Sequence, residues 1–277
     1  MSAVEAGATI GGLLRESGLL RSEAELLLCS ILGCERSHLI AHAEDALDSS
    51  KALLAQDRFA RRRAGEPIAY ITGWREFYGI PLRVTPDVLI PRPETELLVE
   101  LALERLAAGS SGRVLELGTG SGAIAVALAH ERPKPAVVAT DISEAALAVA
   151  RRNARDHGAA IEFVNSDWFE ALGPERFDLI VSNPPYVAAS DAHLERGDAR
   201  FEPRLALVGG EDGLACIRTI AARAQSRLQP GGWLLLEHGY DQGDRCIELL
   251  RELGYADVED FEDLAGVPRV CAGRRLD

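Results

Sequence analysis

Residues 113–122 read RVLELGTGSG, an apolar strand-like run that passes directly into a loop with three glycines. The residues that follow, 122–131, have the composition of a helix. Glycine lets a ligand approach the backbone closely, and a helix N-terminus offers free N–H groups at the positive end of its dipole. In an open α/β sheet, ligands bind at this carboxyl end of the strands. The stretch therefore predicts an α/β fold with a binding site at the loop.

Asp141 stands at the end of the next expected strand, 136–142. A carboxylate at this edge can accept two hydrogen bonds from a ribose diol. The loop and Asp141 together indicate a cofactor that contains a nucleoside, but they do not identify it. GTGSGA also fits the dinucleotide-binding pattern G-x-G-x-x-G/A, with Ala123 last. A tight turn without any ligand is the other interpretation.

Apolar strand-like segments alternate with helix-like segments through the rest of the chain. Further strands are expected at 161–165, 177–182 and 232–237, with two more within 256–275. Helices are expected at 143–157, 211–228 and 242–253. This alternation predicts a mostly parallel sheet that is covered by helices on both faces.

Asp167 and Trp168 follow the expected strand 161–165. In a doubly wound sheet this segment also faces the ligand crevice. Asp167 could accept a hydrogen bond from an adenine amino group, and Trp168 could pack against the ring. The alternative is a buried tryptophan that fills the edge of the sheet.

The strand 177–182 is followed by Asn183-Pro184-Pro185-Tyr186. Two prolines fix φ and remove two N–H donors, so the turn presents acceptors, namely the Asn183 side-chain oxygen and the Pro184 carbonyl. Two acceptors that bind both N–H bonds of a planar –NH₂ group orient its lone pair and stabilise the positive charge that develops on nitrogen. Tyr186 could lie against the planar group. The pattern favours a methyl donor over a nicotinamide cofactor, and an ordinary proline-stopped strand is the alternative.

The N-terminal part follows a different pattern. Apolar residues recur at helical spacing within residues 1–66, which predicts a small helical domain. Residues 67–90 are rich in aromatic and β-branched residues and predict a β-hairpin linker. A Pro-Arg-Pro break centred on Arg92 follows, and residues 91–277 form the larger predicted domain.

The composition of the 277 residues limits the function further. A hydrophobic content of 47% is that of a globular protein with a core, and a net charge of −13 disfavours non-specific binding to nucleic acid. The five cysteines are scattered without a C-x-x-C pair, which predicts a reducing compartment. The sequence has no signal-peptide pattern and no apolar run of membrane-spanning length, so we expect a soluble, cytoplasmic protein without membrane contact. His38 and His42 lack a third ligand nearby in the sequence, so no metal site is expected.

Four motifs occur in a characteristic order: ELGTGSG (116–122), TDIS (140–143), SDWF (166–169) and NPPY (183–186). In this order and spacing they resemble the amino-methyltransferases that use S-adenosylmethionine. Three further motifs narrow the resemblance: PRPETE (91–96), FEPRLALVGGEDGL (201–214) and DLAGVPR (263–269). Over essentially its whole length, the chain resembles the bacterial release-factor glutamine N5-methyltransferase (PrmC/HemK) family.

The resemblance implies a class I S-adenosylmethionine-dependent methyltransferase fold, which is Rossmann-like with a mostly parallel seven-stranded sheet. It implies methyl transfer to the side-chain amide nitrogen (N5) of the glutamine in the Gly-Gly-Gln motif of class-1 peptide-chain release factors. The product of the cofactor is S-adenosylhomocysteine, and no metal takes part. The N-terminal helices and the hairpin are implied to dock the release factor.

The resemblance also assigns roles to individual residues. The cofactor-binding residues are Gly118, Thr119, Gly120, Ser121, Gly122, Asp141, Asp167, Trp168 and Asn183. The catalytic residues are Asn183, Pro184 and Tyr186, which bind the glutamine together with Pro185. Arg92 is expected to line the pocket.

Three other functions remain open at this stage. An adenine-N6 methyltransferase acting on DNA or RNA is the nearest alternative, although many such enzymes carry Asp instead of Asn183. The acidic charge and the lack of a basic recognition domain disfavour sequence-specific binding to nucleic acid. A nicotinamide oxidoreductase and a binding module without enzymatic activity are the other two.

Overall fold

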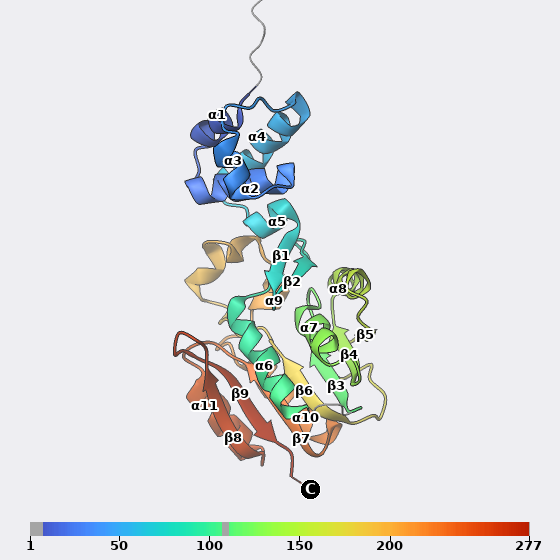
Figure 1. Cartoon of the computed structure of the whole chain (residues 1–277). Coiled ribbons are helices and arrows are strands. Elements are labelled where there is room, and N and C mark those ends of the chain that lie inside the picture. Colours follow the sequence, from blue (N-terminus) through green and yellow to red (C-terminus); the bar gives the residue numbers. More distant parts are fainter. Residues whose placement is uncertain (1–7, 107–110, 277) are drawn as a thin grey trace, which may run out of the picture. The chain divides into compact units, whose positions relative to one another are not determined.

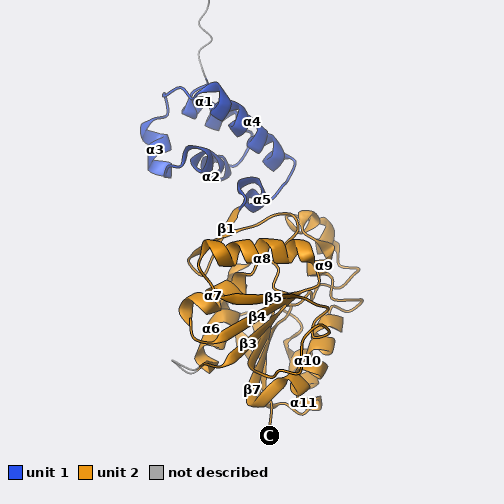
Figure 2. Cartoon of the chain, turned by 90° about the vertical axis from the view of Figure 1, so that its right-hand side faces the viewer, with its two compact units in different colours: residues 1–73 blue, residues 74–277 orange. Residues whose placement is uncertain are grey.

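The computed structural model describes residues 8–106 and 111–276 (Figure 1). The chain divides into two compact units, Met1–Gly73 and Trp74–Asp277 (Figure 2). Within the described residues, no helix combines the length and the apolar character that crossing a membrane requires.

Unit 1 is helical. Its helices are α1 (Ile10–Glu16), α2 (Arg21–Leu32), α3 (Arg36–Ala41), α4 (Ser49–Arg63) and α5 (Ile68–Thr72). The Asp48 side chain caps α4 by accepting from the backbone N–H of Lys51 at 3.0 Å, and Gly33 ends α2 in the left-handed conformation. Leu27, Leu28 and Phe59 form the centre of its core. Residues 1–7 of the predicted helical domain lie outside the described residues.

Residues 67–90, which were expected to form a β-hairpin, do so only in part. Residues Ile68–Thr72 form the short helix α5, because Pro67 precedes it with a fixed φ and Gly73 ends it at a φ of 80°. The hairpin itself is shorter and consists of the antiparallel strands β1 (Trp74–Phe77) and β2 (Ile80–Arg83). Aromatic and β-branched residues thus occur in a helix here because Tyr70 and Ile71 are buried on one side of it.

Unit 2 contains a seven-stranded sheet. Its strands are β3 (Arg113–Leu117), β4 (Ala136–Asp141), β5 (Ile161–Asn165), β6 (Phe177–Ser182), β7 (Leu228–Glu237), β8 (Ala256–Glu262) and β9 (Pro268–Arg274). Their order is β5-β4-β3-β6-β7-β9-β8, and all neighbours are parallel except that β9 is antiparallel to both β7 and β8 (Figure 1). The order reverses direction between β3 and β6, and ligands of open α/β sheets bind at such a switch point.

Helices connect these strands. The longer ones are α6 (Glu96–Arg105), α7 (Ala123–Glu131), α8 (Glu144–Asp156), α10 (Ala215–Arg227) and α11 (Gly243–Glu252). The short ones are η1 (Pro93–Thr95), η2 (Ala192–Glu195), η3 (Ala199–Phe201) and α9 (Arg204–Leu207). The prediction of a mostly parallel α/β fold is therefore confirmed.

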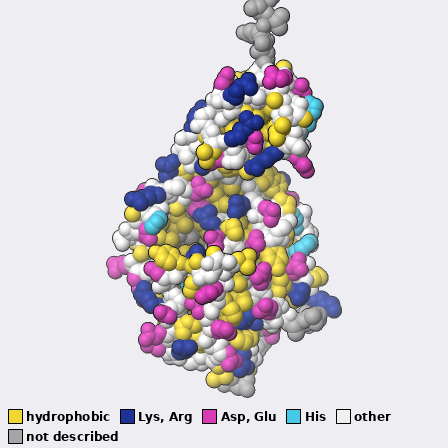
Figure 3. Space-filling view, turned by 60° about the vertical axis from the view of Figure 1, so that its left-hand side comes forward, with side chains coloured by type: hydrophobic (Ala, Val, Ile, Leu, Met, Phe, Trp, Pro, Cys, Tyr) yellow, Lys and Arg dark blue, Asp and Glu magenta, His cyan; other side chains and the backbone are white. Residues whose placement is uncertain are grey.

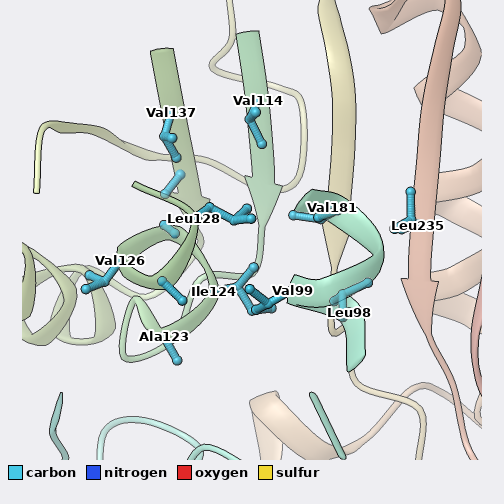
Figure 4. Close-up of a cluster of buried hydrophobic side chains, with 14 of the residues drawn as sticks. Leu98, Val99, Val114, Ala123, Ile124, Val126, Leu128, Val137, Val181 and Leu235 are labelled. Atoms are coloured by element: carbon cyan, nitrogen blue, oxygen red, sulfur yellow. The ribbon is translucent and has the colours of Figure 1, made fainter. Parts of the chain in front are cut away.

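Alternate residues of each strand supply the two cores of unit 2. Figure 4 shows Leu98 of α6 and Ile124 of α7 among Val114, Val181 and Leu235 of the sheet, all of them buried. The opposite face of the sheet packs against α10 and α11 through a second set: Leu115, Ile180, Leu234, Ile217, Ile220 and Leu250. Because both faces are covered, a ligand can reach the sheet only at its edge.

The surface of unit 2 carries mixed charge. On the face that Figure 3 shows, acidic side chains are spread among basic and hydrophobic ones.

Candidate active site

A cavity with a volume of about 360 Å³ lies at the carboxyl ends of β3, β4 and β6. This size suits a small organic ligand. The residues predicted from sequence that line it are Gly118, Gly120, Asp141, Asp167, Trp168, Asn183 and Pro185. Leu89 and Leu205 add apolar walls that the sequence analysis did not identify.

A second cavity of about 50 Å³ adjoins the first and shares Gly118, Gly120 and Asn183 with it. It brings in the remaining loop residues Thr119 and Ser121. Arg92 and Thr95, from the PRPETE motif, also line this cavity. Gly122, Pro184 and Tyr186 line neither cavity.

Asp141 fastens the glycine loop to the end of β4. Its Oδ2 accepts from the backbone N–H of Gly120 at 2.8 Å, and its Oδ1 accepts from the N–H of Ser143 at 2.8 Å. Burial raises the pKa of this carboxyl, while the two backbone N–H groups oppose that shift. Each oxygen retains a second lone pair, so Asp141 can still accept hydrogen bonds from a ligand.

Glu116 is a buried carboxyl that sequence reasoning missed. Its Oε2 accepts from the Thr119 hydroxyl at 2.7 Å and from the backbone N–H of Ala125 at 3.1 Å, which ties the loop to α7. Burial raises the pKa of Glu116 to about 8. The only sequence signal was a charged residue inside the apolar run RVLEL.

The three glycines of the loop have positive φ, but they meet different surroundings. A Cβ at Gly120, where φ is 55°, would have no atom within 4 Å, so the loop leaves open space beside the backbone. A Cβ at Gly122, where φ is 82°, would lie 3.1 Å from the Cβ of Ala150 in α8. Gly120 therefore borders the cavity, whereas Gly122 permits close packing of the loop on α8.

Trp168 adopts a left-handed backbone conformation, with φ at 49°. Its ring reaches within 3.6 Å of the position that a Cβ of Gly118 would take. The indole therefore stands between the loop and the segment after β5, where both border the cavity.

The side chain of Asn183 is oriented by a residue far away in the sequence. Its Nδ2 donates to the Thr95 hydroxyl oxygen at 3.0 Å. Within residues 8–106 and 111–276, neither Oδ1 of Asn183 nor the carbonyl oxygen of Pro184 accepts a hydrogen bond. The Asn183 oxygen is thus available to a ligand in the cavity, whereas Pro184, whose carbonyl also lacks a partner within these residues, lines neither cavity.

Tyr186 is fixed at both ends. Its hydroxyl donates to Oε1 of the buried Glu237 at 3.1 Å, and its carbonyl oxygen accepts from Nε2 of Gln242 at 3.0 Å. Burial and the adjacent carboxylate raise the pKa of Tyr186 well above its usual range. The phenol therefore stays protonated as a hydrogen-bond donor to Glu237.

The GGEDG segment (209–213) packs directly on the NPPY backbone. A Cβ at Gly209 would lie 2.4 Å from the carbonyl oxygen of Pro185, and a Cβ at Gly213 would lie 2.3 Å from that of Tyr186. Side chains cannot occupy these positions unless the backbone moves. This packing explains why the motif carries glycines.

Arg92 and Glu202 join two of the sequence motifs. The Arg92 guanidinium donates to Oε2 of Glu202, while the backbone N–H of Ile90 donates to Oε1 at 3.1 Å. Glu202 is buried, and its burial raises the pKa of the carboxyl against the opposing effect of Arg92. The pair fixes the PRPETE segment next to the FEPR segment.

His38, His42 and His238 each contact other groups of the protein. His238 is fully buried, with Nδ1 2.9 Å from the Gly239 carbonyl and Nε2 2.9 Å from Asp260. The rings of His38 and His42 stack at 4.1 Å. The described part of the chain contains no group of three or more His, Cys, Asp or Glu side chains arranged to hold a metal ion.

The sheet order, the glycine loop and the cavity at the switch point define a class I methyltransferase fold. Residues 94–201 match the family described as Methyltransferase small domain, and residues 10–73 match the PrmC N-terminal domain. A methyltransferase of known structure from Pyrococcus furiosus has a similar fold, with a TM-score of 0.56, 22% identity, and coverage of 80% of this chain and 99% of the other.

Two curated relatives are more similar in sequence. The release factor glutamine methyltransferase of Burkholderia pseudomallei is 53% identical over 96% of both chains. That of Bordetella pertussis is 51% identical over 94% of this chain and 97% of its own length. The chain belongs to the release factor glutamine methyltransferase family.

Proposed function

We propose that this protein transfers the methyl group of S-adenosylmethionine to the side-chain amide nitrogen (N5) of the glutamine in the Gly-Gly-Gln motif of class-1 release factors. The relatives' names and the family support the reaction class. The alternative of an adenine-N6 methyltransferase is not favoured, because the relatives that match nearly the whole chain carry the release-factor name.

The larger cavity fits the cofactor by its chemistry. Its glycine loop offers backbone next to open space, Asp141 retains lone pairs for a ribose diol, and Trp168 provides an aromatic surface. Asp167 lines the same cavity and is proposed to accept a hydrogen bond from the adenine amino group. The cofactor supplies an electrophilic methyl group on a sulfonium, and no step requires a metal.

The NPPY turn is proposed to bind the target amide. An amide nitrogen is a poor nucleophile because its lone pair is delocalised. Asn183 Oδ1 and the Pro184 carbonyl would accept from its two N–H groups, orient the lone pair and stabilise the positive charge that forms on nitrogen. The nitrogen forms the new N–CH₃ bond as the methyl–sulfur bond breaks, and it then releases one proton.

The observation that carries this proposal is the orientation of the Asn183 side chain. Because Nδ2 donates to Thr95, the oxygen is the end that remains for the ligand. An oxygen acceptor suits an –NH₂ donor, whereas the opposite orientation would suit a carbonyl substrate.

Unit 1 is proposed to dock the body of the release factor. Its residues 10–73 match a domain that is named for the same family of enzymes. Because release factors act in translation, the proposed location of the protein is the cytoplasm.

The direct test is methyl transfer from radiolabelled S-adenosylmethionine to a purified release factor. We expect one methyl group per release factor, located by peptide mass spectrometry on the Gly-Gly-Gln glutamine. A release factor in which that glutamine is replaced by glutamate is the matched control and should remain unlabelled. Label in DNA or RNA and none in the release factor would overturn the proposal.

A further inference from the structure

Asn153 is a fully buried side chain in the middle of α8, and it has no role in the mechanism above. None of its surface is exposed, although an asparagine is unfavourable inside a helix and a buried amide is costly unless it is hydrogen-bonded. The segment ARRNARD (150–156) reads as an ordinary polar helix, so nothing in the sequence marked this residue. A buried polar group at such a position requires an explanation from its contacts.

Three hydrogen bonds use the whole amide group of Asn153. Its Oδ1 accepts from the backbone N–H of Arg83 at 2.8 Å, and its Nδ2 donates to the carbonyl oxygen of the same residue at 3.0 Å. Nδ2 also donates to the carbonyl oxygen of Ser121 at 2.8 Å. A backbone N–H can only donate and a carbonyl can only accept, so one orientation of the amide satisfies all three partners. Asn153 therefore joins strand β2 to the glycine loop.

Ser121 is the point of contact on the loop. It lies between Gly120 and Gly122, which both have positive φ, and it lines the smaller cavity. The peptide group that joins Ser121 to Gly122 is held at both ends, because its carbonyl oxygen accepts from Asn153 and its N–H donates to the carbonyl oxygen of Thr119 at 2.8 Å. The position of this peptide group therefore shapes a wall of the cavity.

The loop and α8 approach each other closely at the same place. A Cβ at Gly122 would lie 3.1 Å from the Cβ of Ala150, which stands three positions before Asn153 on α8. Residues three positions apart share a helix face, so Ala150 and Asn153 both face the loop. The small side chain of Ala150 leaves room for the loop backbone, and the amide of Asn153 binds it.

The other anchor of Asn153 is strand β2 of the hairpin. Two further residues of α8 contact this strand: Oδ2 of Asp156 accepts from Nε of Arg83 at 2.8 Å, and Nε2 of His157 lies 2.8 Å from the carbonyl oxygen of Pro81. Strand β2 also pairs with β1 within the hairpin. Several contacts thus fix β2 on α8, and Asn153 extends this support to the glycine loop.

We propose that Asn153 is a positioning residue of the cofactor site, which holds the Ser121 carbonyl and uses β2 as its fixed support. The inference rests on the proposed binding of S-adenosylmethionine at the glycine loop. A cofactor that binds the ordered loop also favours the contact between Asn153 and Arg83, because the three hydrogen bonds share one side chain. By linkage, the intact contact with the hairpin raises the affinity for the cofactor.

Two substitutions on α8 separate the link to the loop from the support of the hairpin. Asn153→Ala removes all three hydrogen bonds and introduces a good helix former, whereas His157→Ala removes a contact with β2 and leaves Ser121 bound. We expect the calorimetric Kd for S-adenosylhomocysteine to rise about tenfold in Asn153→Ala, as for one lost hydrogen bond, and to change by less than about twofold in His157→Ala. Circular dichroism verifies that both variants are folded. Equal Kd values in the two variants would overturn the inference.

Hydrogen exchange in the wild-type protein tests the link without any substitution. The backbone N–H of Arg83 donates to Asn153, whereas that of Tyr78, in the turn of the same hairpin, donates to Oε1 of Glu96 at 2.9 Å. Saturating S-adenosylhomocysteine should slow the exchange of the Arg83 N–H at least about fivefold more than that of the Tyr78 N–H. Equal slowing at the two positions, or none at Arg83, would contradict the inference.

These measurements distinguish the inference from the proposed function. If the wild-type protein does not bind S-adenosylhomocysteine, the proposed cofactor site is wrong and the inference is overturned with it. If the wild-type protein binds S-adenosylhomocysteine and methylates the release factor, but Asn153→Ala binds with the same Kd, the inference alone is wrong.

Discussion

The two sides of the cavity are built in different ways. The loop side, Glu116–Gly122 with Asp141, is held mainly by backbone N–H groups that donate to the two carboxylates. The turn side, Asn183–Tyr186, is held by side chains that lie between 51 and 88 positions away along the chain. The loop side therefore depends on glycines and two acids, whereas the turn side depends on side chains that are distant in the sequence.

The largest expected effect separates turnover from cofactor binding. Asn183→Ala removes an acceptor that the target nitrogen needs in the transition state, so kcat should fall by about 10²- to 10³-fold. The Kd for S-adenosylhomocysteine should change far less, because the loop side stays intact. Single-turnover kinetics and calorimetry measure the two quantities. Equal losses in both would mean that Asn183 chiefly shapes the cofactor cavity, and the distinction between the two sides would be wrong.

The second prediction concerns the stability cost of the buried acid on the turn side. The pKa of Glu237 is raised to about 7 from 4.5, so between these values the folded protein binds more protons than the unfolded chain. The free energy of unfolding should therefore fall as pH rises from about 5 to about 7, by roughly 2 kcal/mol for this group. Glu237→Gln removes the part of this pH dependence that is due to Glu237, while the part that is due to Glu116 remains.

Urea denaturation at both ends of this pH range measures the effect. The exposed Glu248 of α11 provides a control, since Glu248→Gln should leave the pH dependence as it is in wild type. If Glu237→Gln also kept the full pH dependence, Glu237 would not be the buried group that titrates. A variant that is more stable at neutral pH but turns over more slowly is the expected result.

The difference between the loop side and the turn side also explains which site residues could be predicted from the sequence. The loop side was predictable because its glycines, Asp141 and the start of α7 follow one another in a strand–loop–helix pattern. The Asn183–Tyr186 turn was also recognisable as a rigid set of acceptors. Thr95 and Glu237 were not, because nothing local in PRPETE or WLLLE indicates that Thr95 contacts Asn183 or that Glu237 contacts Tyr186.

The secondary structure likewise includes elements that the sequence predicted and one that it did not. The alternation of apolar strands and helices predicted the mostly parallel sheet, which is confirmed. Residues 67–90 were expected to form a β-hairpin from their aromatic and β-branched composition, and this is wrong for residues 68–72, where Pro67 and Gly73 delimit a helix. In a short segment, the flanking residues and burial determine the secondary structure more than the composition does.

The third prediction tests the loop side directly. Asp141→Ala removes a charged acceptor from the cavity, so the Kd for S-adenosylhomocysteine should rise by about 10- to 100-fold. The kcat at saturating cofactor should fall much less, since the NPPY turn is unchanged. Asp141→Asn retains one oxygen acceptor and should give an intermediate Kd. A kcat loss as large as that of Asn183→Ala would show that the two sides act as one unit.

The smallest expected effect distinguishes two glycines within the loop, Gly120 and Gly122. Both Gly120→Ala and Gly122→Ala place a Cβ at positive φ, which costs about 1–2 kcal/mol of stability in each case. Gly122→Ala should be the less stable of the two, because its Cβ would also crowd Ala150 at 3.1 Å, whereas the Cβ at Gly120 meets no atom within 4 Å. Cofactor affinity should show the opposite order, because Gly120 lines the cavity and Gly122 does not. Thermal denaturation with calorimetric titration of both variants measures this, and the same order in both measurements would mean that the loop responds to substitution as a whole.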